Sequence, residues 1–439
     1  MEMKTLEPAA TKPSPQGALR RAREIFAVSA KLGFTSFGGP IAHLGYFHEE
    51  YVNKRKWLSE QKYAELVALC QLLPGPASSQ VGMGIGLYRG GVLGALAAWA
   101  GFTLPSALLL ALFALLLKGT ELAHSGWLHG LKLTAVAIVA QAVWSMGQKL
   151  AAGRSRATIA VLAAAAALLW PNGLAQVLII LISGLIGIWL YRDLPGAPSP
   201  RVDEEPSIAI VLGKKRAIAA LAAFFGLLVI LPLSVWLWPS PGLQLFAGFY
   251  RAGSLVFGGG HVVLPLLESE VVPRGWVGEA DFLAGYGAAQ AVPGPLFTFA
   301  SYLGAAIGGV FGAVLATAAI FLPAFLLVIG VLPFWSRVRG LPNIHRALQG
   351  VNAAVVGILL AALYDPIWTS SVRHTGDVVL VLALFALLVF GNCPLDRRPR
   401  RRRGRRSAWL GLRLVNHFAR HAAVHDEMRP GDERIVGMG

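Results

Sequence analysis

Apolar residues fill most of this chain in long runs that short polar segments separate. Seven runs occupy the first 238 residues, at about 25–39, 63–88, 92–117, 127–146, 157–170, 174–190 and 217–238. Five more follow, one beginning near 245 and the others at about 282–303, 309–335, 346–363 and 378–390. Because roughly 20 apolar residues cross the hydrocarbon of a bilayer as a helix, the pattern predicts an all-α polytopic membrane protein with about twelve apolar segments.

Two of these runs are interrupted by Pro-Gly-Pro, first at 74–76 and again at 293–295. Proline removes a backbone donor and clashes with the preceding turn, and glycine loosens the backbone, so neither run continues as an ordinary helix. Inside a bilayer such a break is tolerated where protein or enclosed water satisfies the freed backbone groups. Broken helices at corresponding positions of two halves are typical of the binding site of a transporter.

The breaks belong to an internal repeat whose offset stays between 218 and 220 positions. The stretch 31–39 recurs as 251–259, and Glu50 recurs as Glu270. Trp57 has its counterpart in Trp276, and Leu104-Pro105 has its counterpart in Leu322-Pro323. The sequence therefore predicts two homologous transporter halves, 21–190 and 217–391.

The number of segments and the placement of charge predict how the halves are oriented. Seven segments lie between the start of one copy and the start of the next, and an odd number of crossings inverts the second copy. Cytoplasmic loops carry excess Lys and Arg, and the basic loops at 149–156, 191–216 and 336–346 all fall inside when the N-terminus is inside. The basic loop 41–62 is the exception, which favours a re-entrant segment at 25–39. We predict inverted repeats with broken or re-entrant helices, a cytoplasmic arm at 1–20, a cytoplasmic linker at 191–216 and a basic cytoplasmic tail at 392–439.

Composition narrows the class of protein. The chain is 55% hydrophobic and only 14% charged, against about a quarter charged in soluble domains. Its net charge of +16 is concentrated at segment ends and in the arginine-rich tail, as in membrane proteins, so we predict no nucleic-acid partner. No signal-peptide pattern is present, which favours a multi-pass protein of a bacterial cytoplasmic (inner) membrane.

Enzyme and metal chemistry find no support in the sequence. The two cysteines, Cys70 and Cys393, provide neither a disulfide framework nor a thiolate metal site. No nucleophile elbow, phosphate loop or zinc helix motif occurs. We therefore predict no enzymatic activity, no cofactor and no metal.

Two cations stand inside apolar sequence, Lys31 and Arg251, at equivalent positions of the repeat. A basic side chain near the bilayer centre costs roughly 2.5–3.5 kcal/mol on insertion scales, so such residues are usually functional. Two inward-facing cations would suit an anion, particularly a dianion. The alternative is that both side chains extend along their long stems to an interface.

Further donors surround the helix breaks. Amides at the N-terminal end of a half-helix carry partial positive charge and can hold an oxyanion, and hydroxyl and amide side chains beside the breaks can complete the site. The alternative is tight helix packing, which small residues also serve in membranes. The predicted substrate-binding residues, besides the two cations, are Gly38, Gly39, Gly258, Gly259, Gln71, Pro74, Gly75, Pro76, Ser79, Gln290, Pro293, Gly294, Pro295 and Thr298.

Histidines and carboxylates follow the Gly-Gly turns. We assign His43, His261, Glu50 and Glu270 to gating or proton linkage, because histidine titrates near neutrality and a carboxylate at a membrane edge can be shifted there. The alternative is local hydrogen bonding. Their spacing fits no standard set of metal ligands.

In these motifs the chain resembles the chromate ion transporter family, in its long form with two homologous halves. The first half carries Phe37-Gly-Gly-Pro-Ile-Ala-His43, Gln71-Leu-Leu-Pro-Gly-Pro76 and Pro105-Ser106. The second half carries Phe257-Gly-Gly-Gly260, Gln290-Ala-Val-Pro-Gly-Pro295 and Leu322-Pro323. The resemblance covers about residues 20–390. It implies chromate efflux across the cytoplasmic membrane with chemiosmotic drive, and a link to sulfate, a dianion of similar shape.

Membrane energetics favour export over uptake. One charge crossing 100 mV is worth about 2.3 kcal/mol, so a dianion leaving a negative interior gains roughly 4.6 kcal/mol. We therefore predict a secondary transporter that exports chromate, driven by the membrane potential or a proton gradient. An importer of sulfate or another small anion and a non-transporting membrane scaffold are the alternatives. The predicted partners are the small oxyanion (chromate, with sulfate as a second candidate) and the lipid bilayer. The sequence does not decide whether two copies of the chain form a homodimer.

Overall fold

The computed structural model describes residues 15–117, 126–170, 173–192, 213–257, 260–335 and 341–390. Across these ranges the regular secondary structure is helical, and no strand occurs. Gly258, Gly259, the basic tail, residues 1–14 of the predicted arm and residues 193–212 of the predicted linker lie outside the described residues. The last residues of the predicted linker, from Lys214, belong to a helix. Five described helices are long and apolar enough to cross a membrane, which supports a multi-pass membrane protein.

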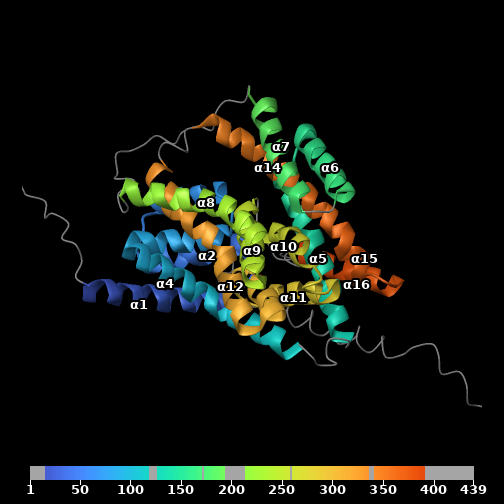
Figure 1. Ribbon diagram of the computed structural model, residues 1–439, viewed down its shortest axis with the longest axis horizontal. Coiled ribbons are helices and arrows are strands. Elements are labelled where there is room, and N and C mark those ends of the chain that lie inside the picture. The colour runs from blue at the N-terminus through green and yellow to red at the C-terminus, as the bar shows by residue number, and fades with distance from the viewer. Residues whose placement is uncertain are drawn as a thin grey trace, which may run out of the picture.

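The described elements of the two halves are similar in order from α1 and α9 onward, as Figure 1 shows by label and colour. The first half consists of α1 (Pro15–Thr35), α2 (Gly39–Phe47), the π-helical η1 (His48–Lys54), α3 (Glu60–Leu72), α4 (Ala77–Leu117), α5 (Gly126–Leu150), α6 (Arg154–Leu169) and α7 (Gly173–Leu190). The second consists of α8 (Lys214–Leu237), α9 (Pro241–Leu255), η4 (Gly260–Val262), α10 (Val263–Val271), α11 (Glu279–Ala291), η5 (Leu296–Thr298), α12 (Phe299–Val331), η6 (Leu332–Phe334), α14 (Pro342–Ala362), η7 (Leu363–Trp368), α15 (Thr369–Ser371) and α16 (Thr375–Phe390).

The repeat aligns α1 with α9, α3 with α11, and α4 with α12. In both halves the Pro-Gly-Pro break separates a 13-residue helix, α3 or α11, from the long helical element that follows. The prediction that these runs are broken at Pro-Gly-Pro is therefore confirmed.

The elements α4 and α12 each double back on themselves. Gly91 and Gly309 have left-handed φ angles of 65° and 63°, and each follows a glycine that is also non-helical. A Cβ on Gly86 would lie 2.3 Å from the carbonyl oxygen of Gly94, eight residues later. In a straight helix eight residues advance about 12 Å, so each element is a hairpin of two packed helices.

The two halves are packed into each other. The hairpin α4 lies against α1 and also against α12, its counterpart from the other half. Helix α14 of the second half packs against α6 and α7 of the first, and all three lie side by side in Figure 1. Large apolar side chains on α7 and α8 face outward, including Trp189 and Trp236, as expected for lipid contact. The number of spans and the inverted orientation stay predictions.

Candidate functional site

The two Pro-Gly-Pro breaks meet the opposite halves of the chain. The backbone N–H of Gly294 donates to the carbonyl oxygen of Ser36 at 2.9 Å, and that of Gly75 donates to the carbonyl oxygen of Val256 at 2.7 Å. Ser36 and Val256 are themselves equivalent in the repeat, at an offset of 220. We call the contact of Gly294 with the first half the first-half crossing, and the contact of Gly75 with the second half the second-half crossing.

Both crossings require glycine. Gly75 and Gly294 have φ angles of 116° and 109°, which L side chains rarely adopt. A Cβ on Gly294 would lie 2.7 Å from Ser106 Oγ, and one on Gly75 would lie 3.3 Å from the Cβ of Ala324, the repeat equivalent of Ser106. The backbone arrangement at the two crossings is therefore nearly the same.

A local twofold axis runs close to the contact between Pro40 and Gly260. These residues are equivalent in the repeat, at an offset of 220. A Cβ on Gly260 would lie 3.6 Å from Pro40 Cγ. Two equivalent positions can touch only near the axis that relates them, so Pro40, Gly260 and the two breaks lie at the interface between the halves.

Side chains that follow each break satisfy its freed carbonyls. Gln80 Nε2 donates to the Pro74 carbonyl oxygen at 2.7 Å, and Thr298 Oγ1 donates to that of Pro295, also at 2.7 Å. The predicted donor Thr298 therefore serves the backbone in this conformation. Ser79 is buried beside Gln80, and its Oγ has no partner. Of the two predicted glutamines, Gln71 is exposed and Gln290 is half-buried.

Both predicted histidines have local partners. His43 is buried, its Nδ1 lies 3.3 Å from Ser78 Oγ, and its ring packs edge-on against Phe102. His261 Nδ1 lies 2.9 Å from Tyr286 Oη and 3.4 Å from Gln290 Nε2. Tyr286 was missed by the sequence reasoning, which had no signal for it because a tyrosine within an apolar run is common. The gating role of these histidines stays a prediction.

The predicted cations and carboxylates form one cluster in each half. Lys31 Nζ lies 3.2 Å from Glu50 Oε2, and Arg251 Nε donates to Glu270 Oε1 at 2.7 Å. Both carboxylates are buried, whereas the side chain of Lys31 is 60% exposed and that of Arg251 is 31% exposed. The structure thus brings together residues that the sequence assigned to two separate roles.

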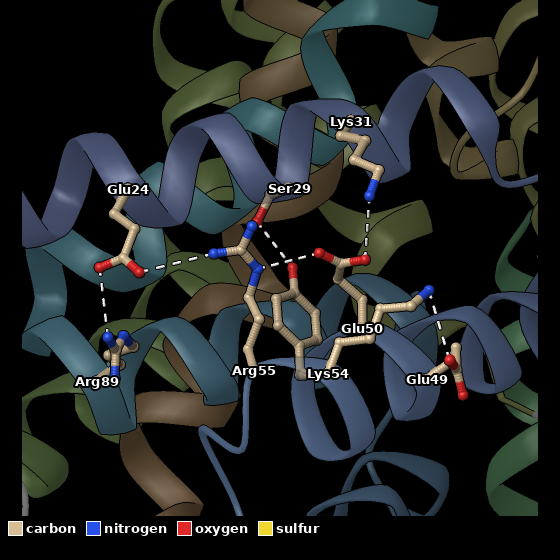
Figure 2. Close-up of polar contacts among 9 residues, drawn as sticks. Glu24, Ser29, Lys31, Glu49, Glu50, Lys54, Arg55 and Arg89 are labelled. Atoms are coloured by element: carbon tan, nitrogen blue, oxygen red, sulfur yellow. Dashed lines mark hydrogen bonds and ion pairs between the residues drawn. The ribbon is translucent and has the colours of Figure 1, made fainter.

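A second arginine completes each cluster. Arg55 Nε lies 3.0 Å from Glu50 Oε1 (Figure 2), and an Arg274 guanidinium nitrogen lies 3.2 Å from Glu270 Oε2. Each carboxylate therefore has two cations and each cluster keeps one excess positive charge. Burial raises the pKa of the Glu50 carboxyl, but hydrogen bonds from Arg55 and Lys31 outweigh it and leave the pKa below its ordinary value. Sequence reasoning missed both arginines, although each stands two residues before a repeated tryptophan.

Among the residues that the structure describes, further charges extend the first-half cluster but not the second-half cluster. Glu24 on α1 lies 3.7 Å from an Arg55 nitrogen and 3.3 Å from an Arg89 nitrogen (Figure 2). The Arg89 guanidinium also lies over the ring of Trp57. The equivalent positions in the second half hold Gln244 and Ile307. The described residues contain no group of three histidine, cysteine or acidic side chains that could hold a metal ion.

Comparison with known proteins gives matches in both halves. The family model described as chromate transporter matches residues 23–188 and 243–396. A chromate transport protein of Pseudomonas aeruginosa is 29% identical over 364 residues, 78% of this chain and 80% of that protein. One from Cupriavidus metallidurans is 28% identical over 374 residues, 84% of this chain and 88% of that protein.

A shorter relative matches only part of the chain. The uncharacterised transporter YwrA of Bacillus subtilis is 31% identical over 155 residues, which are 33% of this chain but 87% of that protein. No solved structure matches the chain.

Proposed function

The chain belongs to the chromate transporter family, as its repeated motifs predicted, and from this premise we propose that it is a secondary transporter that exports chromate across the cytoplasmic membrane. The relatives from Pseudomonas aeruginosa and Cupriavidus metallidurans are described as chromate transport proteins. Chromate is a tetrahedral dianion, so the protein must offer hydrogen-bond donors and positive charge inside an apolar environment.

The reciprocal contact of the two helix breaks is the observation that supports this proposal most. Gly75 and Gly294 each donate a backbone hydrogen bond across the interface between the halves. Irregular backbone is tolerated at membrane depth where it is enclosed by protein or lines a cavity. In transporters built from two repeats, the substrate sits where broken helices of the repeats meet. We place the anion site at this junction.

The clusters around Glu50 and Glu270 would act on the path to that site. Each holds two cations against one carboxylate and so keeps a net positive charge that attracts an anion. A dianion that reaches Lys31 or Arg251 competes with the carboxylate for the cation. We propose that this competition, rather than permanent binding, is the role of the two cations.

Everted membrane vesicles test the function. With a positive potential inside the vesicles, chromate should accumulate without ATP, and the accumulation should collapse when the potential is dissipated. Excess sulfate should slow chromate accumulation if the site accepts either dianion. Chromate that leaves loaded vesicles under the same potential would support an importer instead, and no flux in either direction would support a scaffold.

A further inference from the structure

The two crossings share a backbone arrangement but differ in the side chains around them. Four positions of the first half are polar and buried at the first-half crossing or beside it: Ser36, His43, Thr103 and Ser106. Their repeat equivalents, at offsets of 218 to 220, are Val256, Val263, Phe321 and Ala324, all of them buried and apolar. At these four positions the first-half crossing is therefore polar and the second-half crossing apolar, so the polar side chains beside Gly75 are those of its own break, Ser79 and Gln80.

Several contacts bring the four polar residues close together. Ser36 accepts the hydrogen bond of Gly294, and Ser106 Oγ faces the same glycine. Ser106 Oγ donates to the Thr103 carbonyl oxygen at 3.2 Å, and residues three apart share one side of a helix. His43 lies close to the backbone of Ser36, and its ring packs on Phe102, the neighbour of Thr103.

Three polar atoms of this group have no partner. These are Ser36 Oγ, His43 Nε2 and Thr103 Oγ1, and all three side chains are at least nine-tenths buried. A buried polar group without a partner costs about 1–3 kcal/mol, so native proteins keep such groups where a ligand or water will use them. Three of them beside one helix break indicate a place built for a polar ligand.

The chemistry of these atoms fits an oxyanion. Serine and threonine hydroxyls can both donate, and chromate offers only acceptor oxygens. His43 Nδ1 lies 3.3 Å from Ser78 Oγ, and which of the two donates depends on the tautomer of the ring. If Ser78 donates to Nδ1, the neutral ring carries its proton on Nε2, the atom without a partner. All three atoms can then donate at once.

We propose that the oxyanion is recognised at the first-half crossing alone, by Ser36 Oγ, Thr103 Oγ1 and His43 Nε2, while the second-half crossing serves only to hold the halves together. This inference rests on the proposed function, because it names the part of the junction that binds the transported anion. It moves the site off the local twofold axis and into the first half.

The test measures the KM for chromate in everted vesicles that carry the full-length chain. Ser36→Ala and Thr103→Val each remove one donor to a charged acceptor, and each should raise KM about tenfold or more. His43→Gln keeps a nitrogen donor near the position of Nε2 and should transport better than His43→Val, which carries the second-half residue.

Thr317→Val in α12 is the matched control. Thr317 is also buried, but its Oγ1 already donates to the Ala313 carbonyl oxygen at 2.7 Å within its own helix. Its loss should leave KM within twofold of wild type. Thr103→Val should not lower the melting temperature in detergent, because it removes a buried hydroxyl that has no partner, whereas a merely structural threonine would lower it.

Two readouts separate failure of this inference from failure of the proposed function. If wild type transports chromate and Ser36→Ala and Thr103→Val keep its KM, the first-half site is wrong and the export function stands. If wild type gives no flux, the binding site is tested separately. The measurement is the rise in melting temperature of the purified protein when chromate is added. Stabilisation lost in Thr103→Val but kept in Thr317→Val supports it, and stabilisation unchanged in both, or absent in wild type, overturns it.

Discussion

Each half holds a buried glutamate between two cations, but only in the first half do further charges surround that group. Arg55 is shared between Glu50 and Glu24, and Glu24 also holds Arg89. In the second half Glu270 is the sole carboxylate in contact with Arg251 and Arg274 among the described residues. Partly exposed ion pairs contribute measurably to stability chiefly where several charges form a network. The second-half cluster therefore depends on one carboxylate, whereas the first-half cluster has two.

The largest effect is expected from Arg251. Arg251→Gln removes a cation that offers charge to the anion, so export should fall by at least about a hundredfold while membrane abundance stays intact, since Arg274 still pairs with Glu270. Arg251→Lys installs the residue that the first half uses at the equivalent position, and we expect it to keep most of the activity. Chromate flux in vesicles, normalised to protein in the membrane, measures both. Unchanged export in Arg251→Gln would remove this residue from the transport path.

The two glutamates should differ in their effect on stability. Glu270→Gln leaves Arg251 and Arg274 close together without a counter-charge, and removal of one partner from a buried cluster costs about 3 kcal/mol or more. Glu50→Gln should cost less, about 1 kcal/mol, because Arg55 keeps Glu24 and Lys31 is largely exposed. Thermal unfolding in detergent ranks the variants. A larger loss of stability for Glu50→Gln than for Glu270→Gln would contradict the proposed difference between the two clusters.

The two crossing glycines, Gly75 and Gly294, allow the halves to be compared through the backbone. A left-handed φ costs an L residue about 1–2 kcal/mol at either position. Gly294→Ala also places its Cβ 2.7 Å from Ser106 Oγ, whereas the nearest neighbour of a Cβ on Gly75 is the flexible amide end of Gln80 at 3.1 Å. Gly294→Ala should therefore lower the melting temperature more. Gly294→Ala combined with Ser106→Ala should recover part of the difference, and no recovery would assign it to another cause.

The smallest effect is expected from the extension of the first-half cluster. Arg89→Ile installs the second-half residue and removes a partly exposed ion pair and a contact with the ring of Trp57, which together are worth about 1 kcal/mol. After this change, Glu50→Gln should become more damaging than it is in wild type. A double-mutant cycle measured by thermal unfolding reports that coupling, and strict additivity would show that Arg89 does not support the cluster.

Much of the fold follows from local pattern. The apolar runs predicted helices, and the repeated Pro-Gly-Pro predicted breaks that the structure confirms between α3 and α4 and between α11 and α12. These features depend on residues close in sequence, where proline and glycine act directly on the backbone. The runs at 63–88 and 92–117 also correctly separated the two arms of the α4 hairpin, because Gly90 and Gly91 lie between them.

The site was less predictable because its contacts are long-range. Lys31 and Glu50 are 19 positions apart and meet because η1 lies beside α1, which no periodic pattern encodes (Figure 2). The hydrogen bond from Gly294 to Ser36 depends on how the two halves dock. Alignment of the two halves could have revealed the asymmetry of the crossings, because the equivalent residues differ in polarity: Ser36 against Val256, and Thr103 against Phe321. Positions that the two copies share do not carry this signal.

The reciprocal hydrogen bonds also bear on how such a chain could have arisen. A half alone has a break whose glycine lacks its acceptor, so it is complete only when paired with another half. YwrA matches a third of this chain and most of its own length, which is the size of one half. In a symmetric pair of identical short chains, any substitution changes both crossings together. Once duplication and fusion place the two copies in a single gene, one crossing is free to lose its polar residues while the other keeps them.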